Sequence, residues 1–177
     1  MRIGVLVSGT GSNLRAIVEA GLPVGVVVAD RPCPAAEIAG AAGVPFEVVL
    51  RGSDRTDFTN RVVAVLQRHD VDLVAMAGFM TILALPIFDA FPGRVVNTHP
   101  SLLPAFRGAH AVAEALQAGV KVTGCTIHVA TPAVDAGPIL AQEAVAVLEG
   151  DTVGSLHERI KEVEHRLYPK VLSELAT

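Results

Sequence analysis

The chain opens with the stretch RIGVLVSGTGSNL, residues 2–14, and this stretch decides the fold class. Residues 2–8 form a short apolar run rich in Val and Leu, as expected for a strand that is covered on both faces. The run ends in a glycine-containing turn, and a helical pattern follows directly. This order predicts the first unit of an α/β sheet whose ligands bind at the carboxyl ends of the strands.

The same alternation of apolar runs and helical segments continues along the chain. We expect further strands at residues 23–30, 45–50, 72–77 and 94–98. Residues 54–68 predict an amphipathic helix, because the capping residues Ser53 and Asp54 precede a stripe formed by Phe58, Val62, Val65 and Leu66. Strands that alternate with helices indicate a parallel, doubly wound sheet.

The pattern changes after residue 99. A loop rich in Pro and Gly runs to Gly108, a helix extends to about Ala118, and a long helix covers residues 152–175. Two strand-like runs, 122–130 and 139–147, are joined by a segment long enough to be an ordered functional loop. The predicted fold is therefore α/β, with a doubly wound, mostly parallel sheet of about seven strands and helices on both faces, similar to a Rossmann fold.

Composition limits the possible functions. A chain of 177 residues, 51% of them hydrophobic, has room for one domain with one core, so residues 1–177 are expected to fold as one unit. The net charge of -4 argues against a general affinity for nucleic acid, which depends on clustered Lys and Arg. No apolar stretch approaches the length of a membrane span, so we expect a cytoplasmic protein. The histidines lack the spacing of metal ligands, and no metal is expected.

The first candidate site is the loop from Ser8 to Asn13. Unpaired backbone N–H groups and the positive end of a helix dipole converge there, which favours an anion. Position 14 is Leu, where the dinucleotide fingerprint has a third glycine, and the Gly-Lys-Ser/Thr ending of a P-loop is absent. We therefore expect this loop to hold one phosphate and not a diphosphate. The alternative is a glycine turn with Ser12 or Asn13 as a plain helix cap.

The second candidate site lies at the end of the fifth predicted strand. Asn97 and His99 point to the same face, because side chains alternate along a strand. An amide N–H and a protonated imidazole could both stabilise the oxyanion that forms when an amine attacks a carbonyl. A nearby carboxylate would favour the charged imidazole, and Asp135 is the candidate. The alternatives are a histidine that is simply hydrogen-bonded in a turn and an aspartate that caps one.

Three segments together carry a family resemblance: VSGTGSNL at 7–14, AGFMTIL at 77–83, and NTHPSLLP at 97–104 with DAGP at 135–138. In this combination and order the chain resembles the folate-dependent glycinamide ribonucleotide formyltransferases of purine biosynthesis. The resemblance implies a phosphate of the acceptor at 11–13, a catalytic set of Asn97, His99 and Asp135, and no metal. The co-substrate would be 10-formyltetrahydrofolate.

The resemblance also implies binding residues that the pattern alone does not reveal. It places Met80, Thr81, Ile82 and Leu83 along the pteridine pocket, where the alternative is ordinary core packing. It gives Arg55 and Glu164 roles in binding the folate and the acceptor, where the alternative for each is a solvated helix surface. The family usually carries a basic residue at position 81, so Thr81 puts an ionic contact to folate in doubt. Within the single domain we therefore expect two halves: residues 1–95 bind phosphate, and residues 96–177 carry catalysis and folate binding.

Rival interpretations share part of this pattern. The catalytic domain of a methionyl-tRNA formyltransferase has the later motifs, but the negative charge and the loop at Ser8 to Asn13 favour a small acceptor. A formyl-folate hydrolase shares these motifs as well. A non-catalytic nucleotide-binding regulatory module would explain only the anion loop. We expect small-molecule partners, no nucleic acid or membrane, and a monomer or homodimer.

Overall fold

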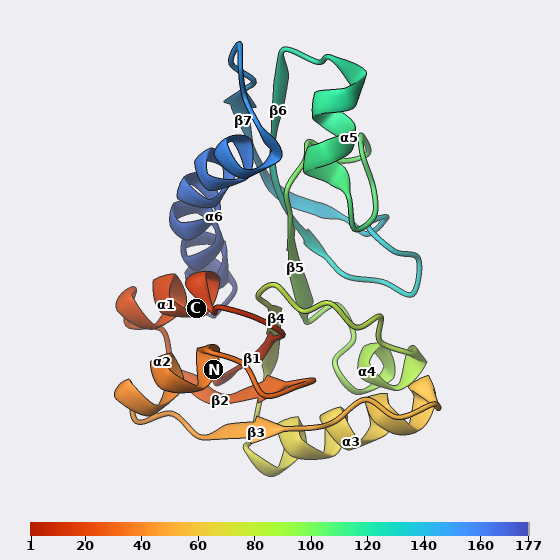
Figure 1. Ribbon diagram of the computed structural model, residues 1–177. Helices are drawn as coiled ribbons and strands as arrows, with labels where there is room; N and C mark the ends of the chain where they lie inside the picture. Colours follow the sequence, from red (N-terminus) through yellow and green to blue (C-terminus); the bar gives the residue numbers. More distant parts are fainter. Residues whose placement is uncertain (177) are drawn as a thin grey trace.

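The computed structural model describes residues 1–176, which form a seven-stranded sheet with helices on both faces (Figure 1). The strand order is β3-β2-β1-β4-β5-β6-β7. The strands are β1 (Ile3–Val7), β2 (Val24–Ala29), β3 (Phe46–Val48), β4 (Leu73–Met76), β5 (Val95–His99), β6 (Val122–Val129) and β7 (Ile139–Ala146). The first five are parallel, whereas β6 pairs antiparallel with both β5 and β7. The predicted strands and the mostly parallel sheet are confirmed, with small shifts at the strand ends.

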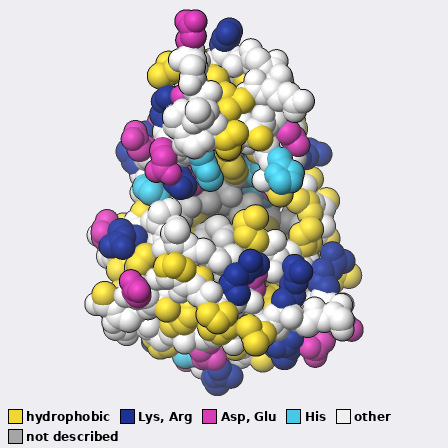
Figure 2. Space-filling view, in the orientation of Figure 1, with side chains coloured by type: hydrophobic (Ala, Val, Ile, Leu, Met, Phe, Trp, Pro, Cys, Tyr) yellow, Lys and Arg dark blue, Asp and Glu magenta, His cyan; other side chains and the backbone are white. Residues whose placement is uncertain are grey.

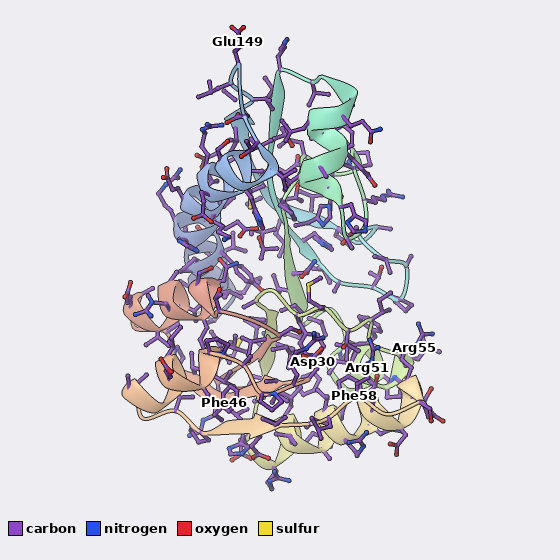
Figure 3. The ribbon with its side chains drawn as sticks, in the orientation of Figure 1. Asp30, Phe46, Arg51, Arg55, Phe58 and Glu149 are labelled. Atoms are coloured by element: carbon purple, nitrogen blue, oxygen red, sulfur yellow. The ribbon has the colours of Figure 1, made fainter. Side chains whose placement is uncertain are left out.

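The helices divide between the two faces of the sheet. They are α1 (Ser12–Glu19), α2 (Ala35–Ala41), α3 (Arg55–Arg68), α4 (Leu85–Ala90), α5 (Ala111–Ala118) and α6 (Val153–Ala176). Buried residues of α1, α2, α5 and α6 belong to one apolar cluster, and those of α3 and α4 belong to the other. Side chains fill the space on both sides of the sheet (Figure 3). The expected coverage of both faces is therefore confirmed.

The alternation of β1 explains why the sheet has two cores. Val5 and Val7 pack into the cluster of α1 and α6, and Leu6 between them packs into the cluster of α3. All three side chains are fully buried. Burying an aliphatic side chain of this size contributes about 1.5–3 kcal/mol, so both faces of this strand stabilise the fold.

The amphipathic helix α3 begins where its capping residue predicts. The carboxylate of Asp54 accepts a hydrogen bond from the backbone N–H of Asp57 at 2.9 Å, and the helix starts at the next residue, Arg55. Ser53 was the other candidate, but Asp54 is the cap. The predicted apolar stripe is buried, with Phe58, Val62 and Leu66 fully enclosed.

The sheet topology places the functional segments at one edge. The carboxyl ends of β1, β4 and β5 lie at the same edge because these strands are parallel neighbours. Helix α6 returns along the side of α1 (Figure 1), so its side chains reach this edge as well. Within residues 1–176, none of the helices has the length and apolar character needed to cross a membrane.

Candidate active site

A cavity of about 640 Å³ opens beyond the carboxyl ends of β1, β4 and β5, on a face that is visibly hollowed (Figure 2). Its wall combines the loop after β1, the segment after β4, the end of β5, the loop between β6 and β7, and part of α6. A volume of this order suits a small organic ligand. Every site residue that the sequence indicated lines this cavity, except Arg55.

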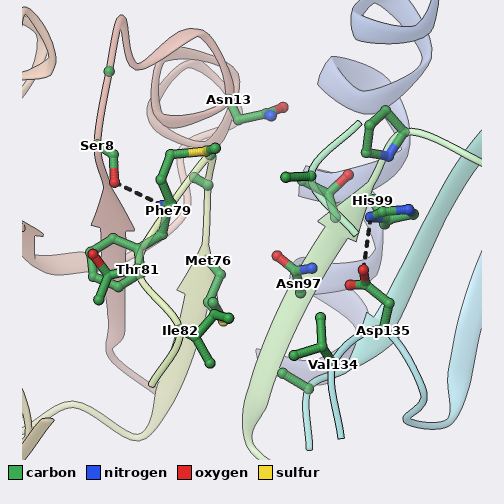
Figure 4. Close-up of a pocket in the computed structure, with 18 of the residues that line it drawn as sticks. Ser8, Asn13, Met76, Phe79, Thr81, Ile82, Asn97, His99, Val134 and Asp135 are labelled. Carbon is green, nitrogen blue, oxygen red and sulfur yellow. Dashed lines mark hydrogen bonds and ion pairs between the residues drawn. The ribbon is translucent and has the colours of Figure 1, made fainter. Parts of the chain in front are cut away.

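Strand β5 supplies Asn97 and His99 to the cavity from the same face, as the alternation predicts. Asn97 is half-buried and His99 is 5% exposed. The His99 Nδ1 atom lies 3.5 Å from Oδ2 of Asp135, which comes from the loop between β6 and β7 (Figure 4). The structure thus brings together the amide, the imidazole and the carboxylate.

Both ring nitrogens of His99 face hydrogen-bond acceptors. Nε2 lies 2.8 Å from the backbone carbonyl of Phe106, which can only accept, so Nε2 carries a hydrogen and donates it. Nδ1 faces the carboxylate of Asp135. These two contacts fix the orientation of the ring, with Nε2 toward the Phe106 carbonyl and Nδ1 toward the Asp135 carboxylate.

Backbone conformation holds the two acceptors in place. Phe106 and Asp135 both have a φ in the left-handed region, at 52° and 51°. Non-glycine residues seldom adopt this region, which is enriched at functional sites. The carboxylate of Asp135 also accepts a hydrogen bond from the backbone N–H of Gly108 at 2.8 Å, so the loop carrying Gly108 fixes its orientation.

His128 is a cavity residue that the sequence analysis did not assign to the site. It lies on β6 directly opposite Asn97, and its Nε2 atom is 3.2 Å from the Asn97 amide nitrogen. Its Nδ1 atom is 3.1 Å from the carbonyl of Val129. Burial lowers the pKa of His128, which favours the neutral ring with its hydrogen on Nδ1. Nε2 then accepts from Asn97 and orients that amide.

The glycine loop ends in the left-handed conformation that only glycine adopts freely. Gly11 has a φ of 77°, and a Cβ at this position would lie 2.8 Å from the Cβ of Ala35. The N-cap of helix α1 is Gly11, and no side chain hydrogen-bonds to the first turn of the helix. Neither Ser12 nor Asn13 is therefore the helix cap, and the plain-cap interpretation is wrong. The first N–H groups of the helix therefore have no intrahelical partner, which suits an anion.

Glu164 is buried, so the surface-helix interpretation is wrong for this residue. It is 5% exposed and lines the cavity from α6. Its carboxylate accepts hydrogen bonds at 3.1 Å from the Asn13 amide and from the Thr98 hydroxyl. The Asn13 Oδ1 atom is buried without a hydrogen-bond partner among residues 1–176. A buried hydrogen-bond acceptor and a buried carboxylate therefore lie beside the glycine loop.

Lys161 and His157 extend this polar wall along α6, and the sequence analysis did not single out either one. They lie one and two helical turns before Glu164, so the three side chains share a face of the helix. The Lys161 ammonium is paired with Glu158 at 2.7 Å. The spacing of these three residues places them on one helix face, but the sequence does not show that this face lies beside α1 and the cavity.

The segment after β4 forms the apolar wall. Met80 and Ile82 are 62% and 53% exposed and line the cavity, so the core-packing interpretation is wrong for these two. Leu83 is largely buried and packs into the apolar cluster of α3 and α4, and it also lines the cavity. Thr81 is buried too, and its hydroxyl donates a 2.6 Å hydrogen bond to Asp30.

Arg55 lines a neighbouring hollow of about 500 Å³ together with Arg51. This hollow shares Met80, Thr81 and Ile82 with the main cavity, so the two are continuous along one wall. Figure 3 shows both arginines near the start of α3. Both guanidinium groups lack an ion-pair partner within residues 1–176. The hollow is therefore suited to an anionic group.

The chain is similar over nearly its whole length to known formyltransferases. Residues 1–172 match the family described as formyl transferase. Phosphoribosylglycinamide formyltransferase of Mycobacterium tuberculosis is 49% identical over 99% of this chain and 85% of its own length. The human trifunctional purine biosynthetic protein adenosine-3 is 40% identical over 99% of this chain and 18% of its own length. The crystal structure of glycinamide ribonucleotide transformylase 1 from Symbiobacterium toebii superposes with a TM-score of 0.93, at 48% identity, over 97% of this chain and 85% of that one.

Proposed function

The chain belongs to the formyl transferase family, and from this premise we propose that it transfers the formyl group of 10-formyltetrahydrofolate to the amine of glycinamide ribonucleotide, a step of purine biosynthesis. The single observation that carries the proposal is the gathering of Asn97, His99 and Asp135 in one cavity that also contains the glycine loop. Two ligands, one with a phosphate and one with a carbonyl, can meet there.

The acceptor is assigned to the side of the cavity formed by α1 and α6. Its phosphate would bind the N–H groups of Gly11, Ser12 and Asn13, where the helix dipole favours negative charge. Lys161 supplies a nearby cation. The Glu164 carboxylate would accept hydrogen bonds from the ribose hydroxyls of the ligand. This places the acceptor amine toward the end of β5.

The folate is assigned to the apolar side. Met80, Thr81, Ile82 and Leu83 would hold the pteridine, with Met80 and Ile82 offering exposed apolar surface. The formyl group on N10 would lie at Asn97 and His99. The folate ends in a carboxylate-bearing glutamate tail, and the hollow at Arg51 and Arg55 would bind it. Backbone contacts at Thr81 do not need the basic residue that the family usually has there.

In the proposed reaction the acceptor amine attacks the formyl carbon and forms a C–N bond. The carbonyl oxygen becomes an oxyanion, which the free amide hydrogen of Asn97 and the protonated His99 stabilise. The intermediate then collapses, the bond between carbon and N10 breaks, and tetrahydrofolate leaves. The net proton transfer is from the acceptor amine to N10. Asp135, 3.5 Å from Nδ1, keeps the His99 ring oriented throughout.

The direct test follows the folate absorbance change on mixing the protein with 10-formyltetrahydrofolate and glycinamide ribonucleotide. We expect formyl transfer that requires the acceptor. Formate release without an acceptor would support a hydrolase, and transfer to methionyl-tRNA in its place would support the rival formyltransferase. A protein that ignores reduced folates would be a binding module, and each of these results would overturn the proposal.

The residue assignment has its own test. His99→Ala should slow turnover about a hundredfold or more, because oxyanion donors in other acyl-transfer sites contribute roughly 3–4 kcal/mol. His69→Ala is a matched control, since His69 pairs with Glu47 away from the cavity. Near-normal turnover of the His99 variant would show that the assignment is wrong. The single-unit organisation, the absence of a metal, the cytoplasmic location and the oligomeric state stay predictions.

A further inference from the structure

Asp30 is a buried carboxylate that the reaction does not use. It follows β2 directly, and its side chain is only 1% exposed. One oxygen accepts from Arg31 Nε at 2.9 Å, and the other accepts from Arg31 Nη2 at 3.0 Å and from the Thr81 hydroxyl at 2.6 Å. A carboxylate enclosed in this way costs desolvation free energy unless its hydrogen bonds are complete. Its partners therefore indicate what it holds in place.

Asp30 reaches the cavity wall through Thr81, next to the point where the glycine loop meets the segment after β4. Thr81 belongs to the segment that we assign to the pteridine, and Ser8 begins the glycine loop. The Ser8 hydroxyl accepts a hydrogen bond from the backbone N–H of Met80 at 2.8 Å (Figure 4). Burial alone would raise the pKa of Asp30, but hydrogen bonds, chiefly from Arg31 and Thr81, outweigh it and hold the pKa below its usual value.

The segment around Thr81 is held by side-chain contacts and isolated hydrogen bonds. Residues 77–84 belong to no strand or helix, so no regular backbone ladder fixes them. Thr81 points inward and is 4% exposed, while its neighbours Met80 and Ile82 point outward and are more than half exposed. Exposure to water does not stabilise these two apolar side chains in the free protein. Thr81 is the buried polar anchor of this segment, and it lies between Phe79 and Leu83, which pack into the apolar cluster of α3 and α4.

We propose that Asp30 is a positioning residue for folate binding: by holding the Thr81 hydroxyl, it helps to fix Met80 and Ile82 as the apolar wall of the cavity. This proposal rests on the proposed function for the identity of the ligand. It also gives Thr81 a role in this chain, since its hydroxyl is committed to Asp30 and the anchor replaces an ionic contact at position 81.

Two substitutions remove the anchor from its two ends. Thr81→Val deletes the hydroxyl with little change in volume, and Asp30→Asn weakens every hydrogen bond to the carboxylate. We expect each to raise the KM for 10-formyltetrahydrofolate about tenfold, which corresponds to about 1.4 kcal/mol. The kcat and the KM for glycinamide ribonucleotide should change less than about twofold. The folate KM of the double variant should be no higher than that of the more affected single variant, because both substitutions act on the same hydrogen bond between Asp30 and Thr81.

Two further variants separate positioning from general damage. Thr81→Ser restores the hydroxyl and should restore the folate KM. Asp151→Asn is the matched control, because Arg159 binds both oxygens of Asp151 as Arg31 binds those of Asp30, and Asp151 lines neither hollow. This control should lower Tm and leave both KM values unchanged.

Binding of tetrahydrofolate, measured by calorimetry, provides a readout that does not need formyl transfer. A weaker tetrahydrofolate affinity in Thr81→Val, with recovery in Thr81→Ser, would support the proposal even if the acceptor proves to be another amine. The proposal is overturned if Thr81→Val binds tetrahydrofolate as tightly as the parent, if Thr81→Ser is as weak as Thr81→Val, or if the variants lower kcat with an unchanged folate KM. If Asp30→Asn does not fold, the two Thr81 variants decide the question.

Discussion

Replacing Asn97 with alanine tests the centre of the proposed mechanism. The amide nitrogen has two hydrogens. One is directed at His128 Nε2, 3.2 Å away, and the other is free for the formyl oxygen. Asn97→Ala removes the free donor, and losing one such donor elsewhere costs about 2.7–4 kcal/mol of transition-state stabilisation. The expected result is a kcat that falls about 10²–10³-fold, with both KM values changed only a few-fold.

The structure also sets the side effects of this substitution. His128 is buried and loses a hydrogen-bond partner, which costs about 1 kcal/mol of folding stability and lowers Tm by roughly 2–4 °C in a chain of this size. A Tm loss in this range cannot explain a hundredfold drop in turnover at 25 °C. Thermal unfolding should therefore be measured alongside the folate absorbance assay.

Two companion variants sharpen the result. Asn97→Asp keeps the shape but places a negative charge beside the oxyanion, so it should be slower than Asn97→Ala. Asn60→Ala removes an exposed amide on α3, outside both hollows, and should behave like the parent. An Asn97→Ala protein that turns over within a few-fold of the parent rate would refute the role of this amide as an oxyanion donor.

The remaining predictions concern acceptor binding and stability. Glu164→Gln should raise the KM for glycinamide ribonucleotide about tenfold with little change in the folate KM, and equal effects on both substrates in steady-state kinetics would contradict the assignment. Gly11→Ala should weaken acceptor binding and lower Tm, because the left-handed φ is strained for alanine by about 1 kcal/mol or more and the added Cβ meets Ala35; a variant with parental Tm and KM would count against this close approach. The pKa of Asp151 lies well below its usual value because of hydrogen bonds from Arg159, from a backbone N–H and from a serine, so its stabilising contribution is complete above the unfolded value near 3.9 and is lost as the pH falls below that value. The Tm difference between the parent and Asp151→Asn should therefore shrink on going from pH 7 to pH 3, and a constant difference would contradict the pairing.

The sequence by itself determined the order and type of the elements. Apolar alternation within β1 and the stripe on α3 are local patterns, and each can be interpreted without knowing its partner. The anion loop was equally local, because a strand, a glycine turn and a helix that follow one another define a helix N-terminus. The pair Asn97 and His99 followed from the period of a single strand.

Tertiary structure alone decided which distant groups meet. Asn13 and Glu164 are 151 positions apart, and their contact exists because α6 packs beside α1. His128 faces Asn97 only through the antiparallel register of β5 and β6, which the sequence of either strand leaves open. The anchor between Asp30 and Thr81 likewise spans two loops at one sheet edge. Local periodicity is a property of neighbours along the chain, whereas a binding site depends on strand order and register, which only packing of the whole chain fixes.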